Sequence, residues 1–256
     1  MPEHSSRVAL VTAGSGGIGH AIAQALVADG CRVVITGRSA EKGERAAGEI
    51  GATFMPADAL DQQQTEGVVD RVCETFGGLD ILVNNAGGSG GAAPVHELSD
   101  AVWMQAFNWN VSSAFWTVRR AVPGMLAKGF GRIINISSMQ GKQANRPNGS
   151  HYIMAKHALN GFTKAVALEY GRLGVTCNAI CVGPVETEMM LSAGPAAAAA
   201  DGLTYEQFKE RYASASMLGR FNTASEVAAM ARLLASDAGG GVTGSILNVD
   251  GGTCPY

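Results

Sequence analysis

Short apolar runs alternate with longer stretches whose apolar positions recur every three or four residues. The apolar runs predict strands at 7–12, 32–36, 53–56, 81–84, 132–136, 175–180 and 245–249. The helical spacing predicts helices at 17–29, 40–50, 61–76, 100–110, 111–128, 152–170, 205–213 and 224–235. Strictly alternating strands and helices favour right-handed βαβ units. We therefore predict an α/β fold with a single doubly wound parallel sheet and helices on both faces.

Residues 191–219, the lid segment, interrupt this alternation. Pro195 is followed there by five alanines, a low-complexity run, and a helix is predicted further on at 205–213. Insertions after strand ends in such sheets tend to lie over the ligand crevice. We interpret the segment as a helical lid over a substrate site; a solvent-facing excursion is the alternative. No linker is evident, so residues 1–256 are expected to form one domain.

Composition narrows the function classes. Apolar residues make up 46% of the 256 positions and the net charge is −3, without a basic block, which argues against nucleic acid as a partner. No run approaches the roughly 18 apolar residues of a membrane span, and residues 1–7 lack the layout of a signal peptide. The five cysteines and five histidines are scattered, so we expect no metal site and a reducing, cytoplasmic location.

A glycine-rich turn, Thr12-Ala-Gly-Ser-Gly-Gly-Ile-Gly19, separates the first predicted strand from the first helix. Glycines allow a sharp turn and close approach of a pyrophosphate, and the helix start offers free N–H groups and its dipole. This position between strand and helix is the one that a dinucleotide site requires. The pattern predicts a Rossmann fold with a bound dinucleotide, against the alternative of a bare tight turn.

The residues after the second strand bear on which dinucleotide binds. Arg38 stands there with no acidic residue at the strand end, and a guanidinium can fork onto a 2′-phosphate. NADP(H) is therefore favoured. Because Glu41 lies nearby, NAD(H) stays possible, and Arg38 is then an exposed loop charge.

Tyr152 and Lys156 stand four residues apart on a predicted helix and should share one face. An ammonium beside a phenol favours the phenolate, so we expect Lys156 to lower the pKa of Tyr152 toward working pH. A tyrosine tuned in this way can exchange a proton during catalysis.

Further motifs follow the predicted strands in a fixed order. They are Asn84-Asn-Ala-Gly87, Asn110 in Asn-Val-Ser-Ser, Ser137-Ser138, Tyr152-x-x-x-Lys156 and Gly183-Pro-Val-Glu-Thr187. With the glycine turn, they make the chain resemble the short-chain dehydrogenase/reductase family over essentially its full length. The resemblance implies an NAD(P)-dependent oxidoreductase in which the cofactor carries hydride.

The resemblance also implies roles for single residues. Ser138 would polarise the substrate carbonyl, with Ser137 as a weaker candidate, and Tyr152 would be the acid or base. Lys156 would hold the nicotinamide ribose, and Asn110 would anchor a water that feeds a proton relay. The implied cofactor-binding residues are Gly14, Ser15, Gly17, Ile18, Gly19, Arg38, Asp58, Ala59, Asn85, Ala86, Gly87, Tyr152, Lys156, Gly183, Val185 and Thr187.

Alternatives stay open at several positions. Asn85 can instead bond the backbone of neighbouring strands, Asn110 can end a helix, and His151 beside Tyr152 is interpreted as a pocket or surface residue. The turn departs from the family pattern at Ala13, where glycine is usual, which leaves its detailed geometry open. Pro184 likewise follows Gly183 instead of preceding it.

The likeness extends to ketoreductases of aromatic polyketides, to 3-hydroxybutyrate dehydrogenases and to acyl-carrier ketoreductases. Apolar residues of the lid region, Met189, Met190, Leu191 and Phe208, suggest a fairly apolar ketone or β-ketoacyl substrate. The expected activity is NADP(H)-dependent reduction of that carbonyl to a secondary alcohol. The alternatives are an NAD-dependent alcohol or 3-hydroxyacyl dehydrogenase and a non-catalytic dinucleotide sensor.

The resemblance further implies a homotetramer. The helices at 100–128 and 152–170 would pair across a twofold axis, and the last strand would lie at a second interface.

Overall fold

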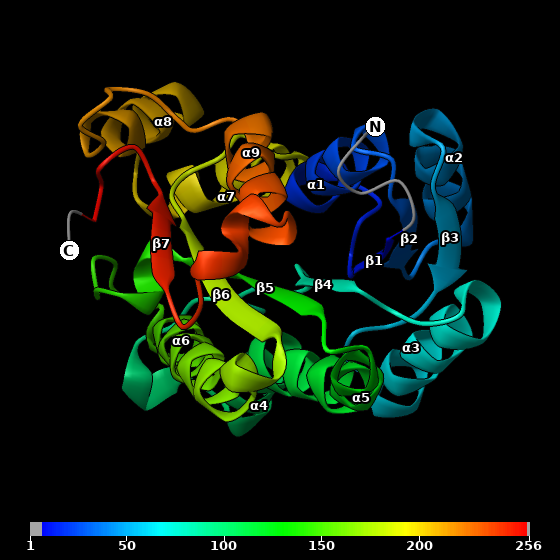
Figure 1. Ribbon diagram of the computed structural model, residues 1–256. Helices are drawn as coiled ribbons and strands as arrows, with labels where there is room; N and C mark the ends of the chain where they lie inside the picture. Colours follow the sequence, from blue (N-terminus) through cyan, green and yellow to red (C-terminus); the bar gives the residue numbers. More distant parts are fainter. Residues whose placement is uncertain (1–6, 255–256) are drawn as a thin grey trace.

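Seven parallel strands form one sheet in the order β3-β2-β1-β4-β5-β6-β7 (Figure 1). The computed structural model describes residues 7–254, without the side chains at positions 189, 193 and 200. The strands are β1 (Val8–Val11), β2 (Arg32–Gly37), β3 (Thr53–Pro56), β4 (Ile81–Asn84), β5 (Gly131–Ser138), β6 (Val175–Val182) and β7 (Ile246–Val249). The predicted α/β fold with a doubly wound parallel sheet is confirmed.

Helices cover both faces of the sheet. They are α1 (Gly17–Ala28), α2 (Ala40–Ile50), α3 (Gln62–Phe76), α4 (Asp100–Phe107), α5 (Ser113–Lys128), α6 (Ser150–Tyr170), α7 (Glu188–Ala200), α8 (Tyr205–Ser214) and α9 (Ala224–Ala235). One apolar core joins the sheet to α1, α2 and α9, and a second joins it to α3, α5 and α6. Burial on both faces explains why the strands are continuous apolar runs instead of alternating ones.

A buried polar network fixes the centre of the second layer. Asn84 on β4 donates to Asn135 on β5 over 2.9 Å, and Asn135 donates to Thr163 on α6, also over 2.9 Å. Thr117 on α5 donates to the Asn84 carbonyl oxygen over 2.6 Å. Fully paired networks of this kind hold elements in one arrangement, because leaving any member unpaired is costly. The network therefore sets α5 and α6 against the strands whose ends carry the site.

The break predicted between helices at 110 and 111 is wrong. α4, a π-helical turn at Asn108–Ser112 and α5 form one continuous helical run. Such π-turns insert one extra residue per turn and often occur at functional sites. Here the turn places Asn110 inside the protein, where it is 1% exposed, instead of at a helix end.

The low-complexity run of the lid segment is also helical. Thr187 caps α7 by accepting from the N–H of Met190, and Pro195 lies inside the helix. The ring of Tyr205 on α8 packs over Gly194, where an added Cβ would approach it to 2.4 Å. α7 and α8 thus form a helical pair at the upper left of Figure 1.

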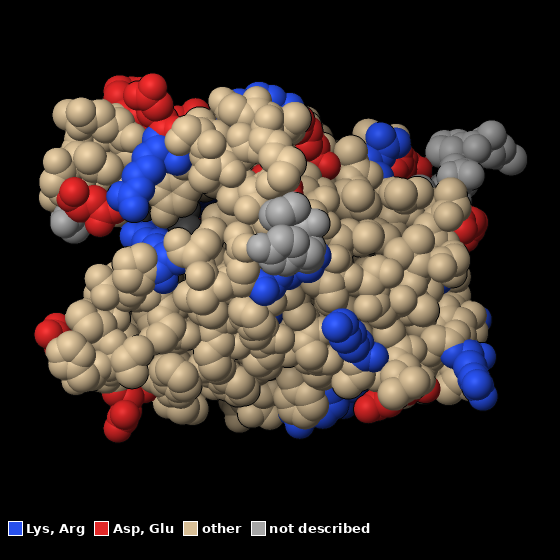
Figure 2. All heavy atoms as spheres, turned by 90° about the vertical axis from the view of Figure 1, so that its left-hand side faces the viewer, with Lys and Arg blue, Asp and Glu red and all other residues tan. Residues whose placement is uncertain are grey.

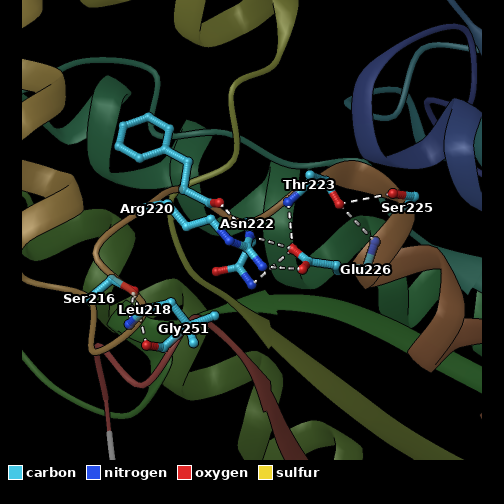
Figure 3. Close-up of polar contacts among 9 residues, drawn as sticks. Ser216, Leu218, Arg220, Asn222, Thr223, Ser225, Glu226 and Gly251 are labelled. Carbon is cyan, nitrogen blue, oxygen red and sulfur yellow. Dashed lines mark hydrogen bonds and ion pairs between the residues drawn. The ribbon is translucent and has the colours of Figure 1, made fainter.

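The segment before α7 and the segment after α8 meet at one junction, and Figure 3 shows the part of it from Arg220 to Glu226. Asn222 donates its backbone N–H to Pro184 and forms an isolated parallel bridge with Val185. Arg220 donates to both carboxylate oxygens of Glu226, at 2.6 and 3.2 Å. Glu226 in turn accepts from the N–H of Thr223, which completes the capping box of α9. The junction therefore ties the lid segment to the core helix α9.

Candidate active site

The loops after β1 and β4 are locked together at the carboxyl edge of the sheet. The Thr12 hydroxyl accepts from the N–H groups of Asn85 and Ala86, at 2.9 and 3.0 Å. The Asn85 amide donates to the carbonyls of Thr12 and Ala13, at 3.0 and 3.1 Å. Asn85 therefore has the structural contacts that were the alternative to a direct cofactor role.

The glycine turn needs small residues for specific reasons. Gly17 has a φ of +56°, and an added Cβ on Gly19 would lie 2.4 Å from the Asn85 amide nitrogen. An added Cβ on Gly14 would lie 2.8 Å from Ile35. Ala13 is an exception, because it carries a Cβ although its φ of 51° is in the left-handed region that favours glycine. The turn keeps its place between β1 and α1 at the cost of that strain.

Sequence-predicted adenosine residues lie at the ends of β2 and β3. Arg38 is exposed directly after β2, and the Ser15 hydroxyl lies 3.0 Å from where a Cβ on Gly37 would be. Asp58 accepts from the N–H of Leu60 and so shapes the loop that also carries Ala59. A small pocket at this edge is lined by Thr12, Thr36, Ala57, Ala59, Thr65, Val68, Asn84, Ala86, Ser113 and Thr117.

The loop after β6 faces the glycine turn. Gly183 packs against Asp250, where an added Cβ would approach the Asp250 Cα to 2.6 Å. Val185 is buried, and the Thr187 methyl lies 3.4 Å from the position of a Cβ on Gly17. Thr187 therefore packs against the first residue of α1, and Ile18, the next residue of that helix, is half-buried.

Tyr152 lies on the first turn of α6 against the end of β5. Its hydroxyl is paired with Ser138, and that contact lowers its pKa, but desolvation by its surroundings is stronger and raises the pKa above its ordinary value. Ser138 also accepts from the N–H of Gln140 over 3.2 Å. The alternative, Ser137, is buried beside Cys181 on β6. Of the two serines, Ser138 is the one in contact with Tyr152.

The expectation that Lys156 lowers the pKa of Tyr152 is wrong in this structure. The Lys156 ammonium lies 5.6 Å from the Tyr152 ring centroid and donates to the Ile136 carbonyl over 2.9 Å. Burial lowers the pKa of Lys156 itself to about 8. The shared helix face brings the two side chains together as predicted, but desolvation is the main cause of the pKa shift of each group.

Asn110 completes this group of polar side chains. Its amide donates to the carbonyls of Gly88 and Ala106, at 2.7 and 2.8 Å, and its buried Oδ1 has no hydrogen-bond partner among the described residues. An added Cβ on Gly87 would lie 2.4 Å from that Oδ1 and 3.3 Å from the Lys156 ammonium. Glycine therefore keeps a polar cradle open between Asn110 and Lys156. An unpaired buried oxygen beside an ammonium fits the ribose end of a nicotinamide dinucleotide and its ordered water.

His151 is a residue whose place the sequence did not reveal. It is fully buried, and its Nε2 lies 3.2 Å from the Gly91 carbonyl oxygen. Adjacent residues on a helix point about 100° apart, so His151 faces the loop after β4 while Tyr152 faces Ser138. The sequence feature that could have indicated this contact is the glycine-rich run 87–91. So flexible a loop keeps one conformation only when neighbouring residues bond to it.

The helices α7 and α8 lie in the upper part of the face shown in Figure 2. A hollow lies beneath this upper part, and Lys and Arg side chains are grouped beside the hollow. Met190 is half-buried and Leu191 is 53% exposed. Phe208 is buried within the lid segment against Tyr212, with ring centroids 4.8 Å apart. The side chain of Met189 lies outside the described part of the protein.

Among residues 7–254, no three His, Cys, Asp or Glu side chains are grouped so that they could hold a metal ion. In that same part of the chain, no helix has the length and apolar character needed to cross a membrane.

Fold and site together define an NAD(P)-dependent oxidoreductase: a doubly wound sheet with a glycine turn at the start of α1, and a Ser–Tyr–Lys group at the carboxyl edge. A family model described as enoyl-(acyl carrier protein) reductase matches residues 12–254. The chain belongs to the short-chain dehydrogenase/reductase family, whose members act on carbonyl and alcohol groups of small molecules.

Individual relatives differ in what they act on. The chain is 40% identical to a D-beta-hydroxybutyrate dehydrogenase of Cupriavidus necator, over 97% of this chain and 98% of the relative. It is 33% identical to a 3beta-hydroxysteroid dehydrogenase of Mediterraneibacter gnavus, over 100% and 98%. A crystal structure of an actinorhodin polyketide ketoreductase variant with NADPH matches with a TM-score of 0.94, 36% identity and 100% coverage of both chains.

Proposed function

We propose that this protein is an NADP(H)-dependent reductase that converts a fairly apolar ketone or β-ketoacyl group to a secondary alcohol, in a reversible reaction. The observation that carries the proposal is the contact of Tyr152 with Ser138 beside the buried Lys156 and Asn110. Since burial does not lower the pKa of Tyr152, its phenol keeps its proton at neutral pH and has that proton to donate to a carbonyl oxygen during reduction.

In this proposal each polar side chain has one task. Ser138 and Tyr152 bind the carbonyl oxygen, and Tyr152 gives it a proton during reduction or takes one during oxidation. Lys156 binds the ribose hydroxyls and Asn110 orients a water through its unpaired oxygen. The bound nicotinamide supplies the hydride. Alignment of these groups lowers the barrier by fixing the reacting atoms in position.

The cofactor would lie along the carboxyl edge. Its diphosphate would meet the glycine turn at Gly14, Ser15, Gly17, Ile18 and Gly19, and its adenosine would meet Arg38, Asp58, Ala59, Asn85, Ala86 and Gly87. Its nicotinamide end would meet Tyr152, Lys156, Gly183, Val185 and Thr187. The exposed Arg38 guanidinium after β2 supports a 2′-phosphate and hence NADP(H) over NAD(H).

We also propose that residues 1–256 form one domain with the lid segment over the substrate, and that the protein is a homotetramer. The hollow in Figure 2, beside which basic side chains gather, supports a lid that borders the substrate site.

The test is a panel of ketones, β-ketoacyl thioesters and alcohols followed by nicotinamide absorbance with NADPH and with NADH. The proposal expects a higher kcat/KM with NADPH, and Arg38→Asp should reduce or reverse that preference. A higher kcat/KM with NADH that Arg38→Asp leaves unchanged supports the second candidate, an NAD-dependent hydroxyacyl dehydrogenase like the hydroxybutyrate relative. Binding of dinucleotide without turnover of any panel compound contradicts both.

A further inference from the structure

An ion pair crosses the start of the cofactor-binding helix. Lys42, on the first turn of α2, donates to the carboxylate of Glu188, the first residue of α7. The two residues are 146 positions apart in sequence and belong to elements on opposite sides of the glycine turn. The pair is a direct side-chain link between the adenosine side of the fold and the helix that leads into the lid segment.

The position of this pair is set by Gly16, the N-cap of α1. A Cβ on Gly16 would lie 3.4 Å from both the Glu188 carboxylate oxygen and the Lys42 ammonium. Thr187, which precedes Glu188, packs against Gly17 on the same turn. The ion pair therefore lies directly over the start of α1, where the helix dipole favours an anion.

The side chains that surround the Glu188 carboxylate are basic, as they are in sites that bind anions. Lys42 lowers the pKa of Glu188 most, and Arg45 and His20 contribute in the same direction. Both partners keep contact with solvent, with side chains that are 39% and 67% exposed. Ion pairs with this exposure are weak and exchange partners readily. A diphosphate carries more negative charge than a carboxylate and makes stronger hydrogen bonds with an ammonium.

We propose that Glu188 competes with the cofactor diphosphate for Lys42, so that Lys42 is a phosphate ligand and Glu188 an antagonist of cofactor binding. This inference rests on the proposed function, because it requires a dinucleotide at the glycine turn. When the diphosphate takes the Lys42 ammonium, the Glu188 carboxylate is repelled and the first turn of α7 moves with it. Cofactor binding is thereby coupled to the lid segment through one exchange of partners.

Isothermal titration of the full chain with NADPH and with NADH tests the exchange without measuring turnover. Glu188→Gln should tighten binding of both dinucleotides about three- to tenfold, the size expected for one exposed charge. Lys42→Met should weaken both by a similar factor, because NADPH and NADH share the diphosphate. Arg38→Asp, by contrast, should weaken NADPH alone.

Glu186→Gln is the matched control. Glu186 is exposed, lies two residues before Glu188 and pairs with Lys209 on α8 at 3.6 Å. Its neutralisation removes the same charge from the same segment and should leave both dissociation constants unchanged. In a double variant, the gain from Glu188→Gln should shrink when Lys42 is already Met, because there is then no ammonium to release.

The outcomes separate the two proposals. If the unaltered chain binds neither dinucleotide, the proposed function fails. If it binds them but Glu188→Gln leaves the affinity unchanged or weakens it, only the exchange is overturned. Loss of affinity for NADPH alone in Lys42→Met also overturns it, since Lys42 would then contact the 2′-phosphate instead of the diphosphate.

Discussion

At the scale of single residues, the Tyr152 hydroxyl is the group on which the proposed chemistry depends. Tyr152→Phe removes the hydroxyl that contacts Ser138 but keeps the ring, whose centroid lies 5.6 Å from the Lys156 ammonium. We expect kcat/KM for ketone reduction to fall by about 10²- to 10⁴-fold, the usual contribution of a positioned acid. The affinity for NADPH, measured by titration, should stay within about twofold. Normal turnover in this variant would show that another group protonates the carbonyl oxygen.

The burial of Lys156 predicts a pH effect on stability. Its pKa is about 8 in the folded protein, below the ordinary lysine value of 10.5, so between these values the unfolded chain binds more protons. Stability contributed through this residue therefore rises as pH increases from about 8 to about 10, by up to about 3 kcal/mol. Urea denaturation of the wild type and of Lys156→Met at several pH values measures it. The free energy of unfolding of the wild type minus that of the variant should increase across this pH window. A constant difference across that window contradicts the burial effect.

Ala13 offers a prediction about backbone strain. Its φ of 51° costs an L-residue with a Cβ more than it costs glycine. Ala13→Gly should raise the free energy of unfolding by about 1 kcal/mol, or the Tm by about 2–4 °C for a chain of this size. Thermal unfolding followed by circular dichroism tests this. Ala23→Gly, inside α1 and fully buried, is the opposite control and should lower the Tm.

At this scale the sequence predicted which side chains lie near one another, but it did not predict the direction of their pKa shifts. The spacing of Tyr152 and Lys156 placed both on one face, as the structure shows. The direction of the Tyr152 pKa was missed, because desolvation depends on atoms from β5 and β6 that spacing does not reveal. The burial of His151 was missed for the same reason: its partner, Gly91, is 60 residues away.

At the scale of elements, the seven strands and most helices could be predicted, because apolar runs between glycine-rich turns leave few alternatives. α7 was missed, since Pro195 and the alanine run resemble a flexible segment, whereas the Thr187 cap and the packing of Tyr205 over Gly194 stabilise a helix there. The π-turn around Asn110 was missed as well. A single π-turn is too short to be recognised in the sequence as a separate element.

The helices α8 and α9 both begin with a capping box but lie in different surroundings, so we expect loss of the two caps to have different effects on stability. Thr223 caps α9, whose Val227 and Ala231 are fully buried, and Thr204 caps α8 in the lid segment. Thr223→Ala should lower the stability of the whole protein by about 1 kcal/mol. Thr204→Ala should instead raise amide hydrogen exchange in residues 205–214 with little change in Tm, because local openings of a lid precede global unfolding. Equal Tm losses in both variants contradict this division.

At the scale of the whole molecule, the site exists because seven parallel strands end at one edge. Residues from the ends of β1, β4, β5 and β6 meet there, although they come from positions as far apart as Thr12 and Thr187. Ligands of doubly wound sheets bind at such carboxyl edges. Loops at that edge are free to vary, which explains how one framework serves hydroxybutyrate, steroid and polyketide substrates among the relatives.

Exposed apolar side chains on α4 and α5 predict assembly. α4 and α5 expose Met104 (50%) and Phe115 (40%), apolar side chains for which association offers burial. Light scattering coupled to size exclusion should give a tetramer mass for the wild type. Phe115→Glu should give a smaller species, because an interface would bury its unpaired charge. Val95→Glu, on an exposed 3-10 turn outside this helix pair, should keep the tetramer. A monomeric wild type, or a Phe115→Glu variant that stays tetrameric, places the interface elsewhere or removes it.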